Sequence, residues 1–189
     1  MSDFNTNEYF QSLSKVMANL DCTQIDVAVN LILKHSTQNA KILTCGNGGS
    51  AYAASHYITD WNKMVNLSTG NKFRGISLCD NYGLITAYAN DVSFDDVFSG
   101  QIKSIGDKGD LLIVVSGSGN SSNVIGAIDT ANGMGITTLA FVGYDGGECK
   151  QRADYCVHVP SFDMQFCEDI HLMLGHIIMK KLCNYSIIS

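Results

Sequence analysis

The sequence predicts an α/β fold built on one parallel, doubly wound sheet, and three observations support this. Residues 110–115 predict a strand buried on both faces, because an unbroken apolar run, 111–115, follows Asp110. Short apolar runs alternate along the chain with segments of helical periodicity. The chain also has 18 glycines and a single proline, a composition that suits many strand-to-helix turns.

Composition indicates one globular domain. The chain has 189 residues, of which 46% are hydrophobic and 16% charged, so it has enough apolar surface for a core. No internal boundary, repeat or low-complexity segment is visible, and we expect a single domain over residues 1–189. The net charge of −6 argues against a nucleic-acid partner. It does not exclude a phosphorylated ligand, because backbone N–H groups can hold phosphate without net positive charge.

The ends and the cysteines suggest a cytoplasmic protein. The N-terminal residues are polar, unlike a secretory signal, and no apolar run is long enough to span a membrane. The seven cysteines are odd in number and form no C-x-x-C pair. We therefore expect reduced core cysteines and no membrane partner.

The expected elements follow from periodicity and from turn residues. Residues 7–38 lack glycine and proline, and they predict two helices with a break near residues 21–23. The first of these helices precedes any strand, and we expect it to pack either against another subunit or against its own core. Five strands are expected at 41–45, 73–78, 110–115, 136–142 and 155–159. Further helices are expected after the first glycine loop and at 82–90, 94–105, 123–132 and 162–182.

The segment from Lys41 to Asp60 contains the first candidate site. After the first strand, Gly46-Asn47-Gly48-Gly49-Ser50 leads into an alanine-rich helix, and the start of that helix offers free N–H groups and a positive dipole end to an anion. His56 and Asp60 share one face of the helix and could bind a metal or transfer protons. No Gly-Lys-Ser/Thr follows, so a nucleotide P-loop is not expected. The alternative is a tight turn with a surface histidine and aspartate.

A second loop resembles the first in chemistry. Residues 116–122, Ser-Gly-Ser-Gly-Asn-Ser-Ser, follow the most apolar strand and begin a helix. Their hydroxyl and backbone donors suit a phosphate monoester, although an ordinary serine-capped turn would have the same composition. A third glycine turn occupies residues 143–147. All three turns follow strands, so we expect them at the carboxyl edge of the sheet, where such folds bind ligands.

Acidic and histidine residues interrupt the last apolar helix. At about 100° per residue, Asp169 and His176 share a face, and Glu168 lies roughly 80° from His176. Either acid could therefore join His176 at one centre. The alternative is that His171 and His176 are hydrogen-bonded polar residues at the edge of a packed face.

Together these stretches resemble the sugar isomerase (SIS) domain family, and within it the isomerases of heptose phosphates. The match covers nearly the whole chain in collinear order. The residues that carry it are Cys45-Gly46-Asn47-Gly48-Gly49-Ser50, His56 with Asp60, Ala89-Asn90-Asp91, Ser116-Gly117-Ser118-Gly119-Asn120-Ser121 with Asn123-Val124, Asp145-Gly146-Gly147, and Glu168-Asp169-Ile170-His171 with His176.

The resemblance implies a three-layer sandwich around a five-stranded parallel sheet. It implies a homotetramer with residues 1–38 as the helical oligomerisation segment and with active sites between subunits. It also implies a zinc ion bound by His56, Asp60, Glu168 and His176, with Asp60 and His176 as catalytic residues. The implied sugar-phosphate contacts are Asn47, Gly48, Gly49, Asp60, Asn90, Asp91, Ser116, Gly117, Ser118, Ser121 and Glu168.

Three positions depart from the family pattern. Asp60 stands where the family usually has glutamate, and Glu168 stands where it usually has glutamine. Residues 62–65 read Asn-Lys-Met-Val in place of the Gly-Arg-Tyr/Phe segment that normally follows the catalytic helix. These departures concern the site and leave the expected fold unchanged.

Two functions of different classes follow. The first is an aldose–ketose isomerase that converts sedoheptulose 7-phosphate to D-glycero-D-manno-heptose 7-phosphate, a precursor of surface-polysaccharide heptose. The second is a non-catalytic SIS module that binds sugar phosphates as a regulator or serves as a replication adaptor. A pure binding module needs the serine and glycine loops but no carboxylate–histidine cluster, so the cluster favours the enzyme.

Overall fold

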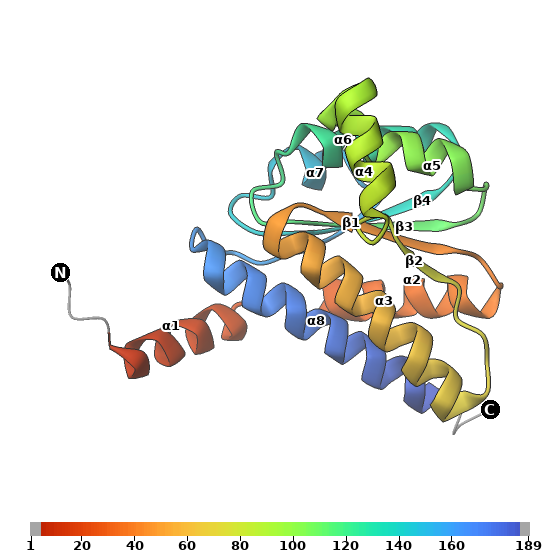
Figure 1. The fold of residues 1–189 in the computed structure, drawn as a ribbon. Helices are drawn as coiled ribbons and strands as arrows, with labels where there is room; N and C mark the ends of the chain where they lie inside the picture. Colours follow the sequence, from red (N-terminus) through yellow and green to blue (C-terminus); the bar gives the residue numbers. More distant parts are fainter. Residues whose placement is uncertain (1–4, 186–189) are drawn as a thin grey trace.

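The chain folds into three layers around one parallel sheet (Figure 1). The structure is a computed structural model and describes residues 5–185; residues 1–4 and 186–189 of the expected domain lie outside that range. The five strands have the order β2-β1-β3-β4-β5, and each neighbouring pair is parallel. Helices α2, α3 and α8 cover one face of the sheet, and helices α4 to α7 lie on the other side.

The strands and helices alternate as the sequence predicts. The strands are β1 (Ile42–Gly46), β2 (Gly75–Ser77), β3 (Leu111–Ser116), β4 (Thr137–Val142) and β5 (Tyr155–His158). The helices are α1 (Thr6–Ala18), α2 (Cys22–Thr37), α3 (Gly48–Thr69), α4 (Tyr82–Asp91), α5 (Ser99–Ile105), α6 (Ser122–Gly133), α7 (Gly147–Arg152) and α8 (Met164–Tyr185).

Side chains of the central strands point alternately into two apolar cores. In β3, Ile113 and Val115 belong to the core under α2, α3 and α8, whereas Leu112 and Val114 belong to the core under α5 and α6. All six residues of β3 are buried. The continuous apolar run at 111–115 therefore has a simple cause, because both faces of this strand are covered by helices.

Two local expectations differ from the structure. The helix expected at 94–105 is divided into a short 3-10 turn (Phe94–Asp96) and α5, and the buried residues Val97 and Phe98 lie between them. The Ser93 hydroxyl accepts the N–H of Asp95 and so begins the 3-10 turn separately. Helix α7, six residues long, was not expected, because its polar sequence has no apolar period to reveal it.

Helix α1 projects from the body of the domain (Figure 1). None of its residues is buried, and Phe10 remains 60% exposed. Its contact with α8 includes the Tyr9 hydroxyl, which donates to Asp169 at 2.6 Å. Within residues 5–185, no single helix is long and apolar enough to cross a membrane; α1 and α2 reach that length only as a pair bent by 73°.

All seven cysteines are free, but not all lie in the core. Cys45, Cys149 and Cys167 are buried as expected, whereas Cys22 is exposed at the start of α2. Burial raises the pKa of the Cys149 thiol to about 12, so this thiol stays protonated at neutral pH.

His171 is a buried polar residue within α8. Its side chain is fully buried, and the backbone of Val142 is the one hydrogen-bonding group beside its ring among residues 5–185, although neither ring nitrogen makes a hydrogen bond of good geometry there. Burial lowers the pKa of His171 from 6.5 to about 4, because the charged imidazolium would lose its hydration. The expected position at the edge of a packed face is therefore wrong for His171, which lies inside that face.

This histidine predicts a pH dependence of stability. Between pH 6.5 and 4 the unfolded chain binds a proton at His171 that the folded chain does not, so the free energy of unfolding falls as the pH falls. The full effect is about 3 kcal/mol. His171→Leu is expected to remove this component. Urea unfolding at fixed protein concentration, at several pH values across that range, measures it; equal pH slopes in variant and wild type would contradict it.

Candidate functional site

The first glycine loop places the start of α3 at the carboxyl edge of the sheet. Strand β1 ends at Gly46 and α3 begins at Gly48, so Asn47 is the N-cap residue. Its side chain makes no capping bond to its own helix within the described structure. Instead its amide bonds to the amide of Asn123 from α6. The first-turn N–H groups of this 22-residue helix are therefore left for a ligand.

The second loop brings the start of α6 to the same place. Ser121 is the N-cap of α6 and likewise makes no side-chain capping bond in the described region. The hydroxyl oxygens of Ser116 and Ser118 accept the N–H groups of Gly119 and Asn120, which leaves both hydroxyl hydrogens able to donate to a ligand.

The two loops enclose one cavity of about 250 Å³. It is lined by Asn47, Gly48, Gly49, Ser50, Val115, Ser116, Gly117, Ser118, Ser121, Met164 and Glu168. No lysine or arginine is among these residues, so an anion there would be held by neutral donors and by two helix N-termini. The prediction that the glycine and serine loops converge is confirmed.

The third glycine turn supports the second loop from outside. The N–H of Cys149 donates to Gly119 O at 2.9 Å, and the N–H of Glu148 donates to Asn120 Oδ1 at 3.0 Å. A side chain at Gly119 would collide with the carbonyl of Gly146. This turn fixes the serine loop and is not itself part of the cavity lining.

Glu168 reaches the cavity from α8. Its carboxylate lies directly against Gly49, where a Cβ atom would collide with it. A carboxylate is thus placed at the positive end of α3, in a cavity suited to an anion. The glycine at position 49 is required for this close approach.

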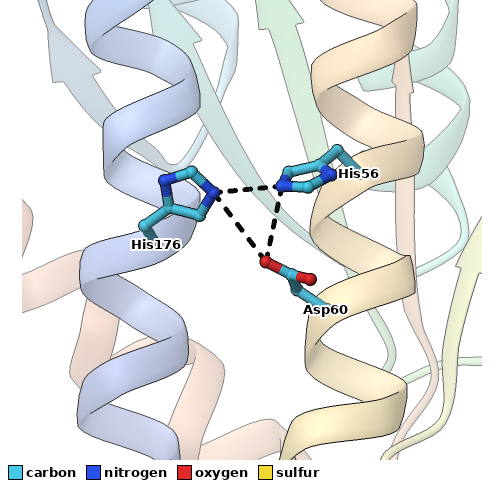
Figure 2. Close-up of side chains that lie close together, drawn as sticks. All are labelled: His56, Asp60 and His176. Carbon is cyan, nitrogen blue, oxygen red and sulfur yellow. Dashed lines mark hydrogen bonds and ion pairs between the residues drawn. The ribbon is translucent and has the colours of Figure 1, made fainter.

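A separate group of polar side chains lies further along the same two helices (Figure 2). His56 Nε2 is 3.0 Å from His176 Nε2 and 3.4 Å from Asp60 Oδ2, and His176 Nε2 is 3.8 Å from the same oxygen. The side chains are 42%, 44% and 19% exposed for His56, His176 and Asp60, so the group is open to solvent. These residues could hold a metal ion.

Contacts between α3 and α8 fix the register of this group. The Tyr57 hydroxyl donates to His171 O at 2.6 Å, and Trp61 Nε1 donates to Gly175 O at 2.9 Å. A side chain at Gly175 would collide with the ring of Tyr57, so the helices approach closely here. His56 and His176 are each adjacent in sequence to one of these residues, and their rings meet as a result.

The structure does not bring together every residue that the sequence suggested. Neither acid considered as a partner of His176 lies in the His56–Asp60–His176 group: Glu168 faces the cavity, and Asp169 accepts a hydrogen bond from Tyr9 on α1. Asn90 and Asp91 are exposed at the end of α4, bonded to each other at 2.7 Å, and are not part of the cavity lining. Met164 also lines the cavity, although no sequence pattern marked it as a site residue.

Comparison with known proteins agrees with this geometry. The sequence model of the SIS domain matches residues 7–143. The chain belongs to the SIS domain family. It is 37% identical over 155 residues to the phosphoheptose isomerase of Clostridium acetobutylicum, covering 82% of this chain and 79% of that protein.

Solved structures of similar proteins share the fold. Phosphoheptose isomerase GmhA from Neisseria gonorrhoeae aligns with a TM-score of 0.80 at 31% identity, covering 91% of this chain and 89% of that one. A phosphoheptose isomerase from Francisella tularensis aligns with a TM-score of 0.88 at 25% identity, covering 93% and 95%. The expected five-stranded SIS fold is confirmed.

The carboxylate in the cavity leads to a prediction about anion binding. Glu168→Gln keeps the shape and removes a negative charge beside the helix N-terminus, so it is expected to raise the affinity for inorganic phosphate about tenfold, or about 1.4 kcal/mol. Titration calorimetry with inorganic phosphate measures this. Glu8→Gln, an equal change of charge on exposed α1, is the matched control. Weaker binding in Glu168→Gln would mean that Glu168 helps to hold the anion.

Proposed function

We propose that this protein is an aldose–ketose isomerase that converts sedoheptulose 7-phosphate to D-glycero-D-manno-heptose 7-phosphate. The observation that carries the proposal is the group of His56, Asp60 and His176 on the two helices that also line the anion cavity. His56 follows Gly49 by seven residues, which is about 10 Å along α3. One end of a phosphorylated sugar can therefore be held at the helix start while its reacting carbons lie beside ionisable groups. The shared name of the similar proteins supports the same activity.

The reaction moves a proton between C1 and C2 of the sugar. A base removes the proton from C1 of the ketose, an enediol or enediolate forms, and a proton is returned to C2 to give the aldose. We assign Asp60 as the base and His176 as the group that handles the proton on oxygen. Their atoms lie 3.8 Å apart, so both can reach adjacent positions of one substrate.

The phosphate end is held by neutral donors. The N–H groups at the start of α3 and the hydroxyls of Ser116, Ser118 and Ser121 face the same cavity. Two helix dipoles and several hydrogen bonds together favour a dianion there. These groups hold the phosphate in one place, and this positions C1 and C2 of the sugar beside Asp60.

The donor set of the polar group fits a zinc ion. Two imidazoles and one carboxylate are a ligand set of catalytic zinc sites, and a fourth position is then left open. With bonds of about 2.0–2.1 Å, tetrahedral ligands are separated by about 3.3 Å, and the observed separations of 3.0, 3.4 and 3.8 Å bracket that value. A bound zinc ion would supply Lewis-acid polarisation of the sugar carbonyl. We propose His56, Asp60 and His176 as the ligands, with Glu168 outside this set. Asp60 Oδ2 and His176 Nε2 cannot bind the metal and carry a proton at the same time, so each acts as an acid or base only while that atom is off the metal.

The wider biological setting follows from the reaction. The product would feed heptose synthesis for surface polysaccharide, in the cytoplasm. The alternative, a non-catalytic sugar-phosphate-binding module, requires only the two loops. The His56–Asp60–His176 group has no purpose in that alternative, and this favours the enzyme.

One assay tests the function directly. The purified protein is incubated with sedoheptulose 7-phosphate, with and without a chelator, and the aldose product is followed. Other ketose phosphates are run in parallel. We expect turnover of the heptulose phosphate; binding of sugar phosphates without any aldose product would instead support the binding module.

Asp60→Asn tests the proposed base without changing the size of the side chain. The amide cannot accept a proton at neutral pH, so the rate is expected to fall at least about 100-fold. Circular dichroism and metal content are measured on the same sample, because loss of the metal would also lower the rate. Asp26→Asn, at an exposed position of α2, is the matched control. A near wild-type rate in Asp60→Asn would make Glu168 or Asp169 the next candidate base.

His176→Ala tests the metal site. Removal of one of two imidazoles is expected to abolish the zinc that the wild-type protein retains through purification without chelator. Elemental analysis per chain gives the readout, independent of activity. His158→Ala, a histidine on β5 outside the group, should keep the metal. Full zinc occupancy in His176→Ala would exclude this site.

Assembly is a further expectation. Helix α1 has no buried residue and exposes Phe10, and the family resemblance assigns the N-terminal helices to a tetramer core. We propose a homotetramer. Light scattering of the intact protein should give about four times the chain mass of 20.5 kDa; a stable monomer at micromolar concentration would contradict this.

A further inference from the structure

Asn123 forms a buried amide pair with Asn47. Asn123 is the second residue of α6 and only 1% exposed. Its Nδ2 donates to Asn47 Oδ1 at 2.9 Å, and Asn47 Nδ2 donates to Asn123 Oδ1 at 2.8 Å. The two residues are 76 positions apart, so this pair directly joins the start of α3 to the start of α6.

The pair changes what Asn47 does at its own helix. An asparagine at an N-cap normally accepts a hydrogen bond from the N–H of the second or third helical residue. Asn47 occupies that position, but its side-chain oxygen accepts from Asn123 instead. Because the amide is turned away from α3, the first-turn N–H groups remain free to bind an anion.

We infer that Asn123 is a positioning residue for the anion cavity, and this inference rests on the proposed function. Asn123 is not part of the cavity lining, so it acts through Asn47, which is. It holds the Asn47 amide in one orientation and keeps the two helix starts at a fixed separation. Without Asn123, the oxygen of Asn47 is free to cap α3 and to occupy the donors that the anion needs.

A purely structural role for Asn123 makes a different prediction. A buried amide that only satisfies a neighbour would stabilise the fold, and its loss would lower stability without changing the affinity for phosphate. Asn132, an exposed residue on the same helix, is the control for loss of side-chain amide hydrogen bonds away from the cavity. Its side chain also makes two hydrogen bonds, one to Arg152 O and one with the Thr138 hydroxyl, at the far end of α6.

The experiment is a double-mutant cycle read by phosphate binding. Inorganic phosphate is titrated calorimetrically into wild type, Asn123→Ala, Asn47→Ala and the double variant. Asn123→Ala is expected to weaken phosphate affinity about tenfold. The double variant is expected to be no weaker than the weaker single variant, because both changes act through one amide pair. Asn132→Ala should bind phosphate as wild type does.

A second variant guards against failure to fold. Asn123→Leu keeps a similar branched shape in the buried site and removes the hydrogen bonds, and it should show the same loss of affinity. With the ketose phosphate as substrate, KM should rise about tenfold in these variants while kcat stays within about twofold, since the defect lies in binding.

The outcomes separate the inference from the proposed function. Unchanged phosphate affinity in Asn123→Leu, or single losses that multiply in the double variant, would overturn the inference. Absence of phosphate binding by the wild type would overturn both. A coupled loss of phosphate affinity in a protein that does not turn over heptulose phosphate would support the positioning role and overturn the proposed function.

Discussion

The close contact between α3 and α8 determines where Glu168 and the His56–Asp60–His176 group lie. Gly175 permits the approach, and the hydrogen bonds from Tyr57 and Trp61 to backbone carbonyls of α8 fix the register. With the register fixed, Glu168 meets Gly49 at one end of the contact and His176 meets His56 further along. Both helices begin at the carboxyl edge of the sheet. Their fixed register therefore sets the distance between the anion cavity and the His56–Asp60–His176 group.

The cavity depends on helix starts that are left without side-chain caps. An uncapped N-terminus costs stability in an ordinary helix, usually about 1 kcal/mol. Here α3 and α6 both lack the side-chain cap in the described structure, although asparagine and serine occupy the N-cap positions. Residues suited to capping are therefore present, but their side chains do not cap these helices. The uncapped backbone N–H groups of both helix starts face the same cavity. This is the expected form of an anion site that contains no lysine or arginine.

Much of this arrangement could be predicted from the sequence, because it depends on local patterns. The buried run of β3, the glycine loop after β1 and the serine loop after β3 fix the sheet edge at which ligands bind. The side-chain contacts between different helices could not be predicted as well from the sequence. A helical wheel places Asp169 on the face of His176, yet α1 supplies Tyr9 as the partner of Asp169. The wheel also cannot show which residue of α3 faces Glu168, since this depends on the register set by Gly175.

The Asn47–Asn123 pair is a second example of a contact that the sequence alone could not predict. Asparagine is favoured at helix N-caps; Asn47 occupies the N-cap of α3, whereas Asn123 is the second residue of α6. Only the packing of α3 against α6 lets the two amides meet, across 76 residues of chain.

The charge of the site gives a reason for a cation that is independent of the family. Asp60 on α3 and Glu168 on α8 each contribute a carboxylate to this region. A bound phosphate monoester adds a charge of about −1.5 to −2 at neutral pH. The donors of the cavity are neutral, so they reduce this repulsion without cancelling it. A divalent ion held by His56, Asp60 and His176 would offset two negative charges close to the reacting carbons. The carboxylate of Glu168 increases that need, because it adds a negative charge to the lining of the cavity.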